Sequence, residues 1–233
     1  MNSDIESRDR LIVALDFEDI QQAKSLVVEL GESVTFYKIG LQLCMTGEYF
    51  GLLDWLVAKQ KKVFVDLKFF DIPATVGKAV KQLSGRGITF ATVHGNDGIM
   101  RAAAENKGDV RILAVTVLTS LDRGDLDDLG FECDVEALVL SRASRAIELG
   151  CDGVVASGQE ASAMRQSLGD GFLVVSPGIR PVQNDDDQKR VVTPTQALNN
   201  GADYLVVGRP ITAASDPVLA AQGIQKEIAA ACG

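Results

Sequence analysis

The sequence has few of the residues from which metal centres and disulfide frameworks are built. It contains one histidine and four cysteines in 233 residues. Cys44, Cys133, Cys151 and Cys232 stand far apart, and no pair has the CxxC spacing of metal-binding or redox-active cysteines. This scarcity argues against a zinc site with cysteine and histidine ligands. Free thiols in turn favour a reducing compartment, the cytoplasm.

Long apolar runs and an excess of positive charge are also missing. No uninterrupted apolar stretch reaches the length of a membrane span, and the N-terminal residues MNSDIESRDR contain no apolar signal core. The formal net charge is −9, from 23 basic and 32 acidic side chains. We therefore expect a cytoplasmic protein that binds neither nucleic acid nor membranes. An anionic ligand would need a local cluster of basic groups.

Short apolar segments and amphipathic segments alternate along the whole chain. No linker, repeat or low-complexity stretch interrupts them, and hydrophobic residues make up 46% of the sequence, enough for a large core. This alternation predicts βα units and a parallel sheet. We expect strands at residues 11–15, 35–39, 63–68, 90–93, 112–118, 153–156, 172–175 and 204–207. Helices are expected at 18–30, from after the second strand to about 60, and at 73–84, 98–106, 135–149, 160–168, 194–200 and 217–230, with an acidic loop at 121–134.

Eight strands, each followed by a helix, predict an α/β fold: a single (β/α)8 TIM barrel that occupies residues 1–233 as one domain. A doubly wound open sheet is the alternative. The first strand-to-helix turn, Asp16-Phe17-Glu18, lacks the glycine-rich phosphate loop typical of that alternative. The barrel is therefore the favoured prediction.

The third predicted strand ends in an unusual concentration of charge. Asp66 and Lys68 are two residues apart, so on an extended strand their side chains point the same way. Ionised side chains are costly to bury unless they are paired. Asp71 follows just before Pro73, where a helix can begin. The spacing alone allows either a structural ion pair with a nearby loop acid or a functional group of charges.

Polar residues at the other strand ends favour the functional interpretation. They are Asp16, Lys38, Asp66, Lys68, His94, Thr119, Arg180 and Arg209. In a (β/α)8 barrel these ends meet at one mouth, which holds the active site, and the ends of strands seven and eight form its phosphate-binding corner. Arg180 and Arg209 stand at that corner, and Gly208 offers a backbone N–H. We interpret His94 as structural, although a lone histidine is also a candidate general base.

The run Asp66-Leu67-Lys68-Phe69-Phe70-Asp71-Ile72-Pro73 resembles the DxKxxDIP signature of the orotidine 5′-phosphate decarboxylase family. Further motifs in the family's order are Ala14-Leu15-Asp16, Tyr37-Lys38-Ile39-Gly40, Pro177-Gly178-Ile179-Arg180 and Val207-Gly208-Arg209-Pro210-Ile211. The resemblance covers nearly the whole chain. It implies decarboxylation of orotidine 5′-monophosphate to uridine 5′-monophosphate and CO2, the last step of de novo pyrimidine nucleotide synthesis. It also implies a homodimer with shared active sites and no metal or cofactor.

The resemblance also assigns roles to residues. It implies an alternating array of Lys38, Asp66, Lys68 and Asp71, with Asp71 from the partner subunit and Lys68 as the donor of a proton to C6 of the pyrimidine. The implied substrate-binding residues are Asp16, Lys38, Asp66, Ile72, Thr75, Thr119, Arg180, Gln188, Gly208 and Arg209. Thr75 would come from the partner subunit, and Ser120 would assist Thr119 at the base. The polar loop 181–192 is expected to act as a lid.

Two other functions are weighed against this one. A magnesium-dependent relative, a 3-keto-gulonate-phosphate decarboxylase or hexulose-phosphate synthase, shares an Asp-x-Lys-x-x-Asp core. Such enzymes carry a metal-binding glutamate on the second strand, where this chain has Lys38, a cation that would repel the metal. A non-catalytic phosphosugar-binding protein would show a broken charge array, whereas all four members are present here.

Overall fold

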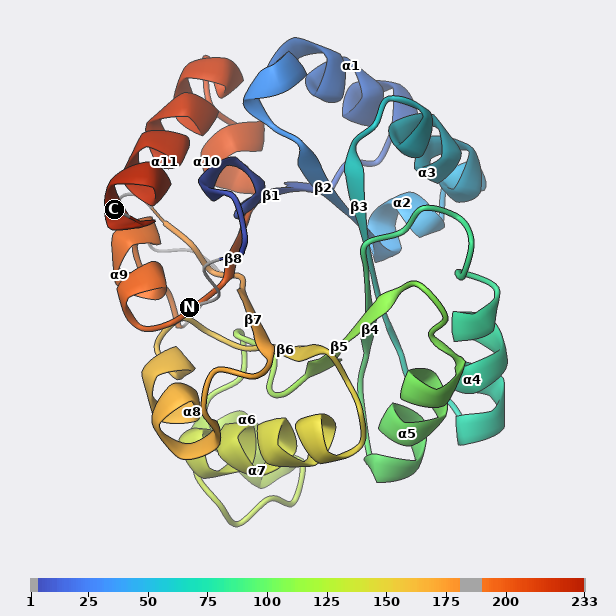
Figure 1. The fold of residues 1–233 in the computed structure, drawn as a ribbon, viewed down its shortest axis with the longest axis vertical. Coiled ribbons are helices and arrows are strands. Elements are labelled where there is room, and N and C mark those ends of the chain that lie inside the picture. The colour runs from blue at the N-terminus through green and yellow to red at the C-terminus, as the bar shows by residue number, and fades with distance from the viewer. Residues whose placement is uncertain (1–3, 181–189, 233) are drawn as a thin grey trace.

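Eight parallel strands close into a barrel in sequence order in the computed structural model, which describes residues 4–180 and 190–232 (Figure 1). The strands are β1 (Leu11–Leu15), β2 (Phe36–Gly40), β3 (Lys62–Phe69), β4 (Phe90–Val93), β5 (Arg111–Val115), β6 (Gly153–Val155), β7 (Leu173–Ser176) and β8 (Tyr204–Val207). The last strand pairs with the first, with Leu205 opposite Leu11. This closure confirms the predicted (β/α)8 barrel and rules out the open doubly wound sheet.

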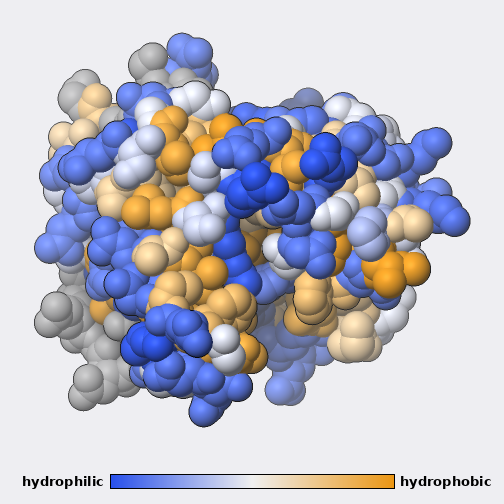
Figure 2. Space-filling view, turned by 90° about the horizontal axis from the view of Figure 1, so that it is seen from below, coloured by the Kyte–Doolittle hydropathy of each residue, from blue (hydrophilic) through white to orange (hydrophobic). Residues whose placement is uncertain are grey.

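Helices surround the barrel on its outside (Figure 1). They are α1 (Ile20–Leu30), α2 (Leu41–Cys44), α3 (Tyr49–Ala58), α4 (Pro73–Lys81), α5 (Asp97–Asn106), α6 (Arg123–Asp128), α7 (Val135–Glu148), α8 (Ala161–Leu168), α9 (Pro194–Asn199), α10 (Arg209–Thr212) and α11 (Pro217–Cys232). The face of the molecule in Figure 2 is largely hydrophilic, with smaller apolar groups between the polar ones. Among the helices of the described residues, none combines the length and the hydrophobicity needed to cross a bilayer.

Aromatic side chains fill the interior of the barrel. Phe36, Phe64, Phe90 and Tyr204 come from four different strands and are almost fully buried. Their ring centroids lie 5.0 to 5.9 Å apart, at tilted or edge-to-face angles. Because side chains alternate along a strand, the neighbours of Phe64 pack outward in the larger core under the helices. Phe64 also lines the pocket described below, so this aromatic layer lies directly beneath the site.

Two helix predictions are wrong. The helix expected from the second strand to about residue 60 is broken into α2 and α3, with Gly47 at φ +80° between them. The acidic segment 121–134, predicted as a loop, contains α6. The Asp122 carboxylate accepts hydrogen bonds from two backbone N–H groups of this helix, and the Asp125 carboxylate accepts one from the backbone of Asp122. This capping box stabilises the start of a short helix that composition alone does not suggest.

Strand ends differ from the prediction where the chain turns toward the site. β5 ends at Val115 rather than at residue 118, and β3 continues to Phe69. Beyond β5, residues 117–120 leave the sheet and line the pocket. The sequence gives no sign of this turn because the residues at 115, 117 and 118 are as apolar as the strand before them.

Candidate active site

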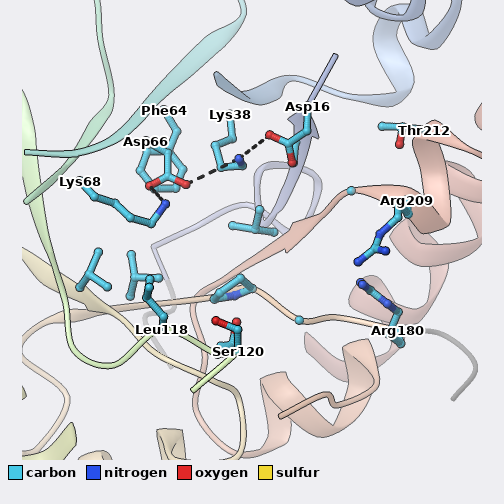
Figure 3. Close-up of a pocket in the computed structure, with 18 of the residues that line it drawn as sticks. Asp16, Lys38, Phe64, Asp66, Lys68, Leu118, Ser120, Arg180, Arg209 and Thr212 are labelled. Atoms are coloured by element: carbon cyan, nitrogen blue, oxygen red, sulfur yellow. Dashed lines mark hydrogen bonds and ion pairs between the residues drawn. The ribbon is translucent and has the colours of Figure 1, made fainter. Parts of the chain in front are cut away.

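A pocket with a volume of about 470 Å³ opens at the carboxyl ends of the strands, and Figure 3 shows it closely. Barrels of this kind hold their active sites at this end. The pocket is lined by Ala14, Asp16, Lys38, Phe64, Asp66, Lys68, Val115, Val117, Leu118, Thr119, Ser120, Val155, Pro177, Gly178, Arg180, Val206, Gly208, Arg209 and Thr212. Of the polar residues predicted at strand ends, it brings together all but His94.

A row of alternating charges crosses one side of the pocket (Figure 3). The Lys38 Nζ lies 2.9 Å from Oδ1 of Asp16 and 3.6 Å from Oδ2 of Asp66. The Lys68 Nζ in turn lies 2.9 Å from Oδ1 of Asp66. The row therefore runs Asp16, Lys38, Asp66, Lys68 across the ends of β1, β2 and β3, so that each strand end contributes to one continuous network.

Neighbours of opposite sign keep the centre of this row charged. Burial alone would raise the pKa of Asp66, but the charges of Lys38 and Lys68, together with hydrogen bonds from Lys68 and Thr92, hold that pKa below its usual range. Burial would likewise lower the pKa of Lys38, but Asp66 and Asp16 raise it above its ordinary value. Asp66 is therefore a carboxylate and Lys38 an ammonium at neutral pH.

Lys68 reaches Asp66 from an uncommon backbone conformation. Its φ is +49°, and the pairing of β3 with β4 shifts register between Val65 and Phe69. The predicted proximity of Asp66 and Lys68 is confirmed, but the extended strand from which it was predicted is wrong at this point. Irregularities of this kind re-aim side chains beside active sites.

Two arginines stand at the opposite end of the pocket from Lys68. Arg180 follows β7 and Arg209 begins α10, and Figure 3 shows their guanidinium groups facing each other. Gly208, which also lines the pocket, precedes α10. The sequence analysis missed α10, whose Pro210 in the first turn is the one signal for a helix start there. Two guanidinium groups beside a glycine backbone suit the oxygens of a phosphate.

Three predicted site residues lie outside this pocket. Asp71, Ile72 and Thr75 stand at the start of α4, where all three are exposed. The Asp71 carboxylate accepts a hydrogen bond of 2.6 Å from the backbone N–H of Ile72. A fourth predicted residue, Gln188, and most of the predicted lid fall outside the described residues. The charge row built by one chain therefore does not include Asp71.

His94 lies beside the pocket. Its ring meets the edge of the Phe70 ring at a centroid distance of 5.7 Å. Burial, followed by the positive charges of Arg142 and Lys68, lowers the pKa of His94 below its usual value. The imidazole is therefore neutral at pH 7, and its structural interpretation stays a prediction.

The sequence analysis missed two residues that belong to this region. Thr212, from α10, lines the pocket near Arg209 (Figure 3). Thr92 of β4 is completely buried and contacts the charge row from behind, through a hydrogen bond from its hydroxyl to Asp66. A signal for Thr92 was present, because it is the one polar side chain in an otherwise apolar strand, Phe90–Val93.

No metal-binding cluster is found in the described part of the chain: residues 4–180 and 190–232 contain no group of three histidine, cysteine or acidic side chains arranged to hold an ion. Asp16 and Asp66 both contact the Lys38 ammonium. A cation of the protein itself therefore neutralises the two carboxylates that a metal would need.

Comparison with known proteins agrees with this geometry. Residues 9–224 match the family model described as Orotidine 5′-phosphate decarboxylase / HUMPS family. The chain is 65% identical over 229 residues to orotidine 5′-phosphate decarboxylase of Methylococcus capsulatus, covering 97% of this chain and 95% of the relative. It is 53% identical over 226 residues to the protein of the same name from Stenotrophomonas maltophilia, covering 96% and 94%.

A solved structure is similar as well. The crystal structure of orotidine 5′-phosphate decarboxylase from Lactobacillus acidophilus superposes with a TM-score of 0.83 at 36% sequence identity, covering 94% of this chain and 99% of that one. The similarity therefore extends over nearly the whole fold.

Proposed function

The chain belongs to the orotidine 5′-phosphate decarboxylase / HUMPS family, and from that premise we propose how its pocket carries out the reaction. The enzyme converts orotidine 5′-monophosphate to uridine 5′-monophosphate and CO2 in pyrimidine biosynthesis. The magnesium-dependent alternative is not favoured, since the similar relatives carry the name of this decarboxylase. The observation that carries the proposal is a row of alternating charges ending in Lys68, with two arginines at the other end of the same pocket.

The polar groups of the pocket give the substrate a single orientation. The phosphate binds at the arginine end, the ribose lies beside Asp16 and Lys38, and the pyrimidine lies near Thr119 and Ser120, with its C6 carboxylate toward Asp66. The proposed substrate contacts are Asp16, Lys38, Asp66, Ile72, Thr75, Thr119, Arg180, Gln188, Gly208 and Arg209. Binding at both ends fixes the reacting carbon against the charge row, which lowers the entropic part of the barrier.

Lys68 is the proposed stabilising cation and proton donor. When the bond from C6 to the carboxylate breaks, its electron pair stays on C6 in an sp² orbital that the ring cannot delocalise well. CO2 leaves as a neutral molecule. The Lys68 ammonium stabilises the carbanion and then transfers a proton to C6, which completes the product, and the lysine regains a proton from water. This chemistry requires a fixed ammonium group, and the 2.9 Å contact with Asp66 supports one.

We propose two roles for Asp66. It holds the Lys68 ammonium in place, and it faces the substrate carboxylate, whose negative charge it opposes. Both carboxylates are charged before the reaction, and the repulsion between them ends when CO2 departs. The low exposure of the Asp66 side chain, 12%, supports this role, because solvent screens a charge less when the group is buried.

Electrostatics at one lysine accounts for only part of the rate. Two unit charges about 4 Å apart interact by about 4 kcal/mol at an effective dielectric of about 20. At about 1.4 kcal/mol for each tenfold change, that is about three orders of magnitude in rate. Binding energy from the phosphate, which lies away from the reacting carbon, must therefore contribute by holding the substrate in the water-excluded site.

A homodimer with shared active sites is also part of the proposal. Asp71, Ile72 and Thr75 lie outside the pocket of their own chain and are exposed, so they are available to a second copy. Ile72 and the neighbouring Phe70 are 66% and 69% exposed, which is a large apolar exposure for the start of a helix. Covering these side chains with a partner would bury them and would bring an acid to the end of the partner's charge row.

Two further properties complete the proposal. The reaction uses no metal or organic cofactor, because Lys68 provides both the positive charge and the proton. The enzyme works in the cytoplasm, and its four cysteines, all of which are described and none of which forms a disulfide, support a reducing compartment.

Activity without metal is the first expected result. Purified protein treated with a chelator should consume orotidine 5′-monophosphate, measured as a change in ultraviolet absorbance, at the same rate with and without added Mg²⁺. The reason is that Lys38 and Lys68 already neutralise the acids of the row. No turnover without added Mg²⁺ would overturn the assignment to metal-free decarboxylation.

Loss of Arg209 should weaken substrate binding. We expect Arg209→Ala to raise KM for orotidine 5′-monophosphate by about 10- to 100-fold, because one charge-assisted contact to phosphate contributes about 1.5–3 kcal/mol. The matched control is Arg86→Ala, which removes an exposed arginine paired with Asp54 outside the pocket. Steady-state kinetics with orotidine, which has no phosphate, should not distinguish Arg209→Ala from wild type. An unchanged KM for the nucleotide would remove Arg209 from the phosphate site.

A further inference from the structure

Thr92 joins the two reacting groups of the charge row through a single hydroxyl. Its Oγ1 donates a hydrogen bond of 2.9 Å to Oδ1 of Asp66 and accepts one of 2.9 Å from the backbone N–H of Lys68. The residue is 0% exposed. None of the described residues of β4 lines the pocket, so Thr92 does not face the substrate. Any effect it has on the reaction must pass through Asp66 and Lys68.

The hydrogen bond from Lys68 to Thr92 matters because the backbone of Lys68 has an uncommon conformation. Among the described residues, only Gln60 and Lys68 have a positive φ without being glycine. Such a conformation persists only where the surroundings hold it. β3 and β4 shift register at this point, and the Lys68 N–H donates its hydrogen bond to the Thr92 hydroxyl rather than to a strand carbonyl. Backbone hydrogen bonding between the two segments resumes one residue later, where the N–H of His94 donates to the carbonyl of Phe69. The hydroxyl thus replaces a ladder hydrogen bond at the point where Lys68 turns into the pocket.

The carboxylate of Asp66 is held from two sides at the same atom. Its Oδ1 accepts from the Thr92 hydroxyl and from the Lys68 ammonium, both at 2.9 Å. The Thr92 bond comes from the neighbouring strand, so it fixes the rotation of the carboxylate independently of Lys68. Without it, the carboxylate could turn with the flexible lysine side chain.

We propose that Thr92 is a positioning residue for the decarboxylation, because its hydroxyl fixes the Asp66 carboxylate and the left-handed backbone of Lys68 in one geometry. The inference rests on the proposed role of Lys68. It predicts a larger effect on the chemical step than on substrate binding, since Thr92 contacts the groups that act at C6 and lies away from the arginine end. Small displacements of catalytic groups lower rates substantially even when binding is unchanged.

Thr116 provides a matched control for the loss of a buried hydroxyl. It follows β5, is also 0% exposed, and its hydroxyl donates a hydrogen bond of 3.0 Å to the carbonyl of Val155. It neither lines the pocket nor contacts the charge row. Thr92→Val and Thr116→Val therefore remove the same group from equally buried positions, and only the first removes a contact to reacting groups.

Steady-state kinetics of four variants tests the inference. We expect Thr92→Val to lower kcat by about 10- to 100-fold with KM within about twofold of wild type. Thr92→Ser keeps the hydroxyl and should restore most of kcat, and Thr116→Val should keep kcat near wild type. Thermal unfolding of each variant reports its stability. If Thr92→Val does not fold, Thr92→Ala takes its place in the comparison with Thr92→Ser.

Three results would overturn the inference. They are a wild-type kcat in Thr92→Val or its alanine replacement, an equal loss of kcat in Thr92→Ser, and an equal loss in Thr116→Val. Failure of the proposed role of Lys68 would look different, because Lys68→Ala would then retain activity. An inactive Lys68→Ala together with a fully active Thr92→Val would reject only the role of Thr92.

Discussion

Replacing Lys68 by alanine should lower kcat by at least about three orders of magnitude while leaving the fold intact. The change removes both the cation that stabilises the carbanion and the proton that C6 receives. The side chain is 32% exposed and packs in no core cluster, so its loss leaves the barrel unaffected. Asp66 keeps its ion pair with Lys38 and its hydrogen bond from Thr92, so the buried carboxylate still has partners in the variant.

The comparison with Lys68→Arg separates charge from proton transfer. Arginine keeps the positive charge but does not give up a proton at neutral pH. We therefore expect Lys68→Arg to be strongly impaired as well. Lys24→Ala is the control, since Lys24 lies over the ring of Trp55, outside the pocket. Kinetics, binding of uridine 5′-monophosphate and thermal unfolding should be measured together. A Lys68→Ala enzyme that binds the product and retains a kcat within about tenfold of wild type would remove Lys68 from its role.

The barrel could be predicted from the sequence because its determinants are local. Each strand is a short apolar run with a helix-like pattern after it, and eight such units have one common closed arrangement. Closure then brings strand ends far apart in the sequence to one mouth. Asp16, Lys38 and Asp66 stand in or directly after three different strands, yet their predicted proximity needed no knowledge of any side-chain conformation. The motif at residues 66–73 then indicated which reaction the site catalyses.

The features that could not be predicted from the sequence depend on contacts between segments that are distant in the chain. The left-handed φ of Lys68 is stabilised by Thr92, which lies on the next strand, and no pattern within β3 signals it. Likewise, the chain turns from β5 into the pocket at residues as apolar as the strand itself. The start of α6 is different, because its capping residues are local: Asp122 and Asp125 have the three-residue spacing of a capping box, which is visible in the sequence.

Mixing two inactive variants should restore activity if the sites are shared between subunits. Lys68→Ala removes the proton donor from its own pocket, and Asp71→Ala removes an acid that we propose acts in the partner's pocket. Each homodimer then has two defective sites. A mixed dimer has one site with both defects and one site with neither, because Lys68 and Asp71 of an intact site come from different chains. With random subunit exchange of equal amounts, about half of the dimers are mixed, and about a quarter of wild-type activity should return.

The control for this experiment combines Lys68→Ala with a chain that carries both substitutions. No arrangement of those chains contains an intact Lys68, so that mixture should stay inactive whatever the dimer affinity. Restoration in the first mixture and not in the second would assign Asp71 to the neighbouring pocket, in agreement with its exposure at the start of α4 in its own chain. Subunit exchange is checked separately with a tagged chain. If exchange is complete and the first mixture remains as inactive as its parents, the sites are not shared. The charge row would then end at Lys68, whose acidic partner among the described residues is Asp66.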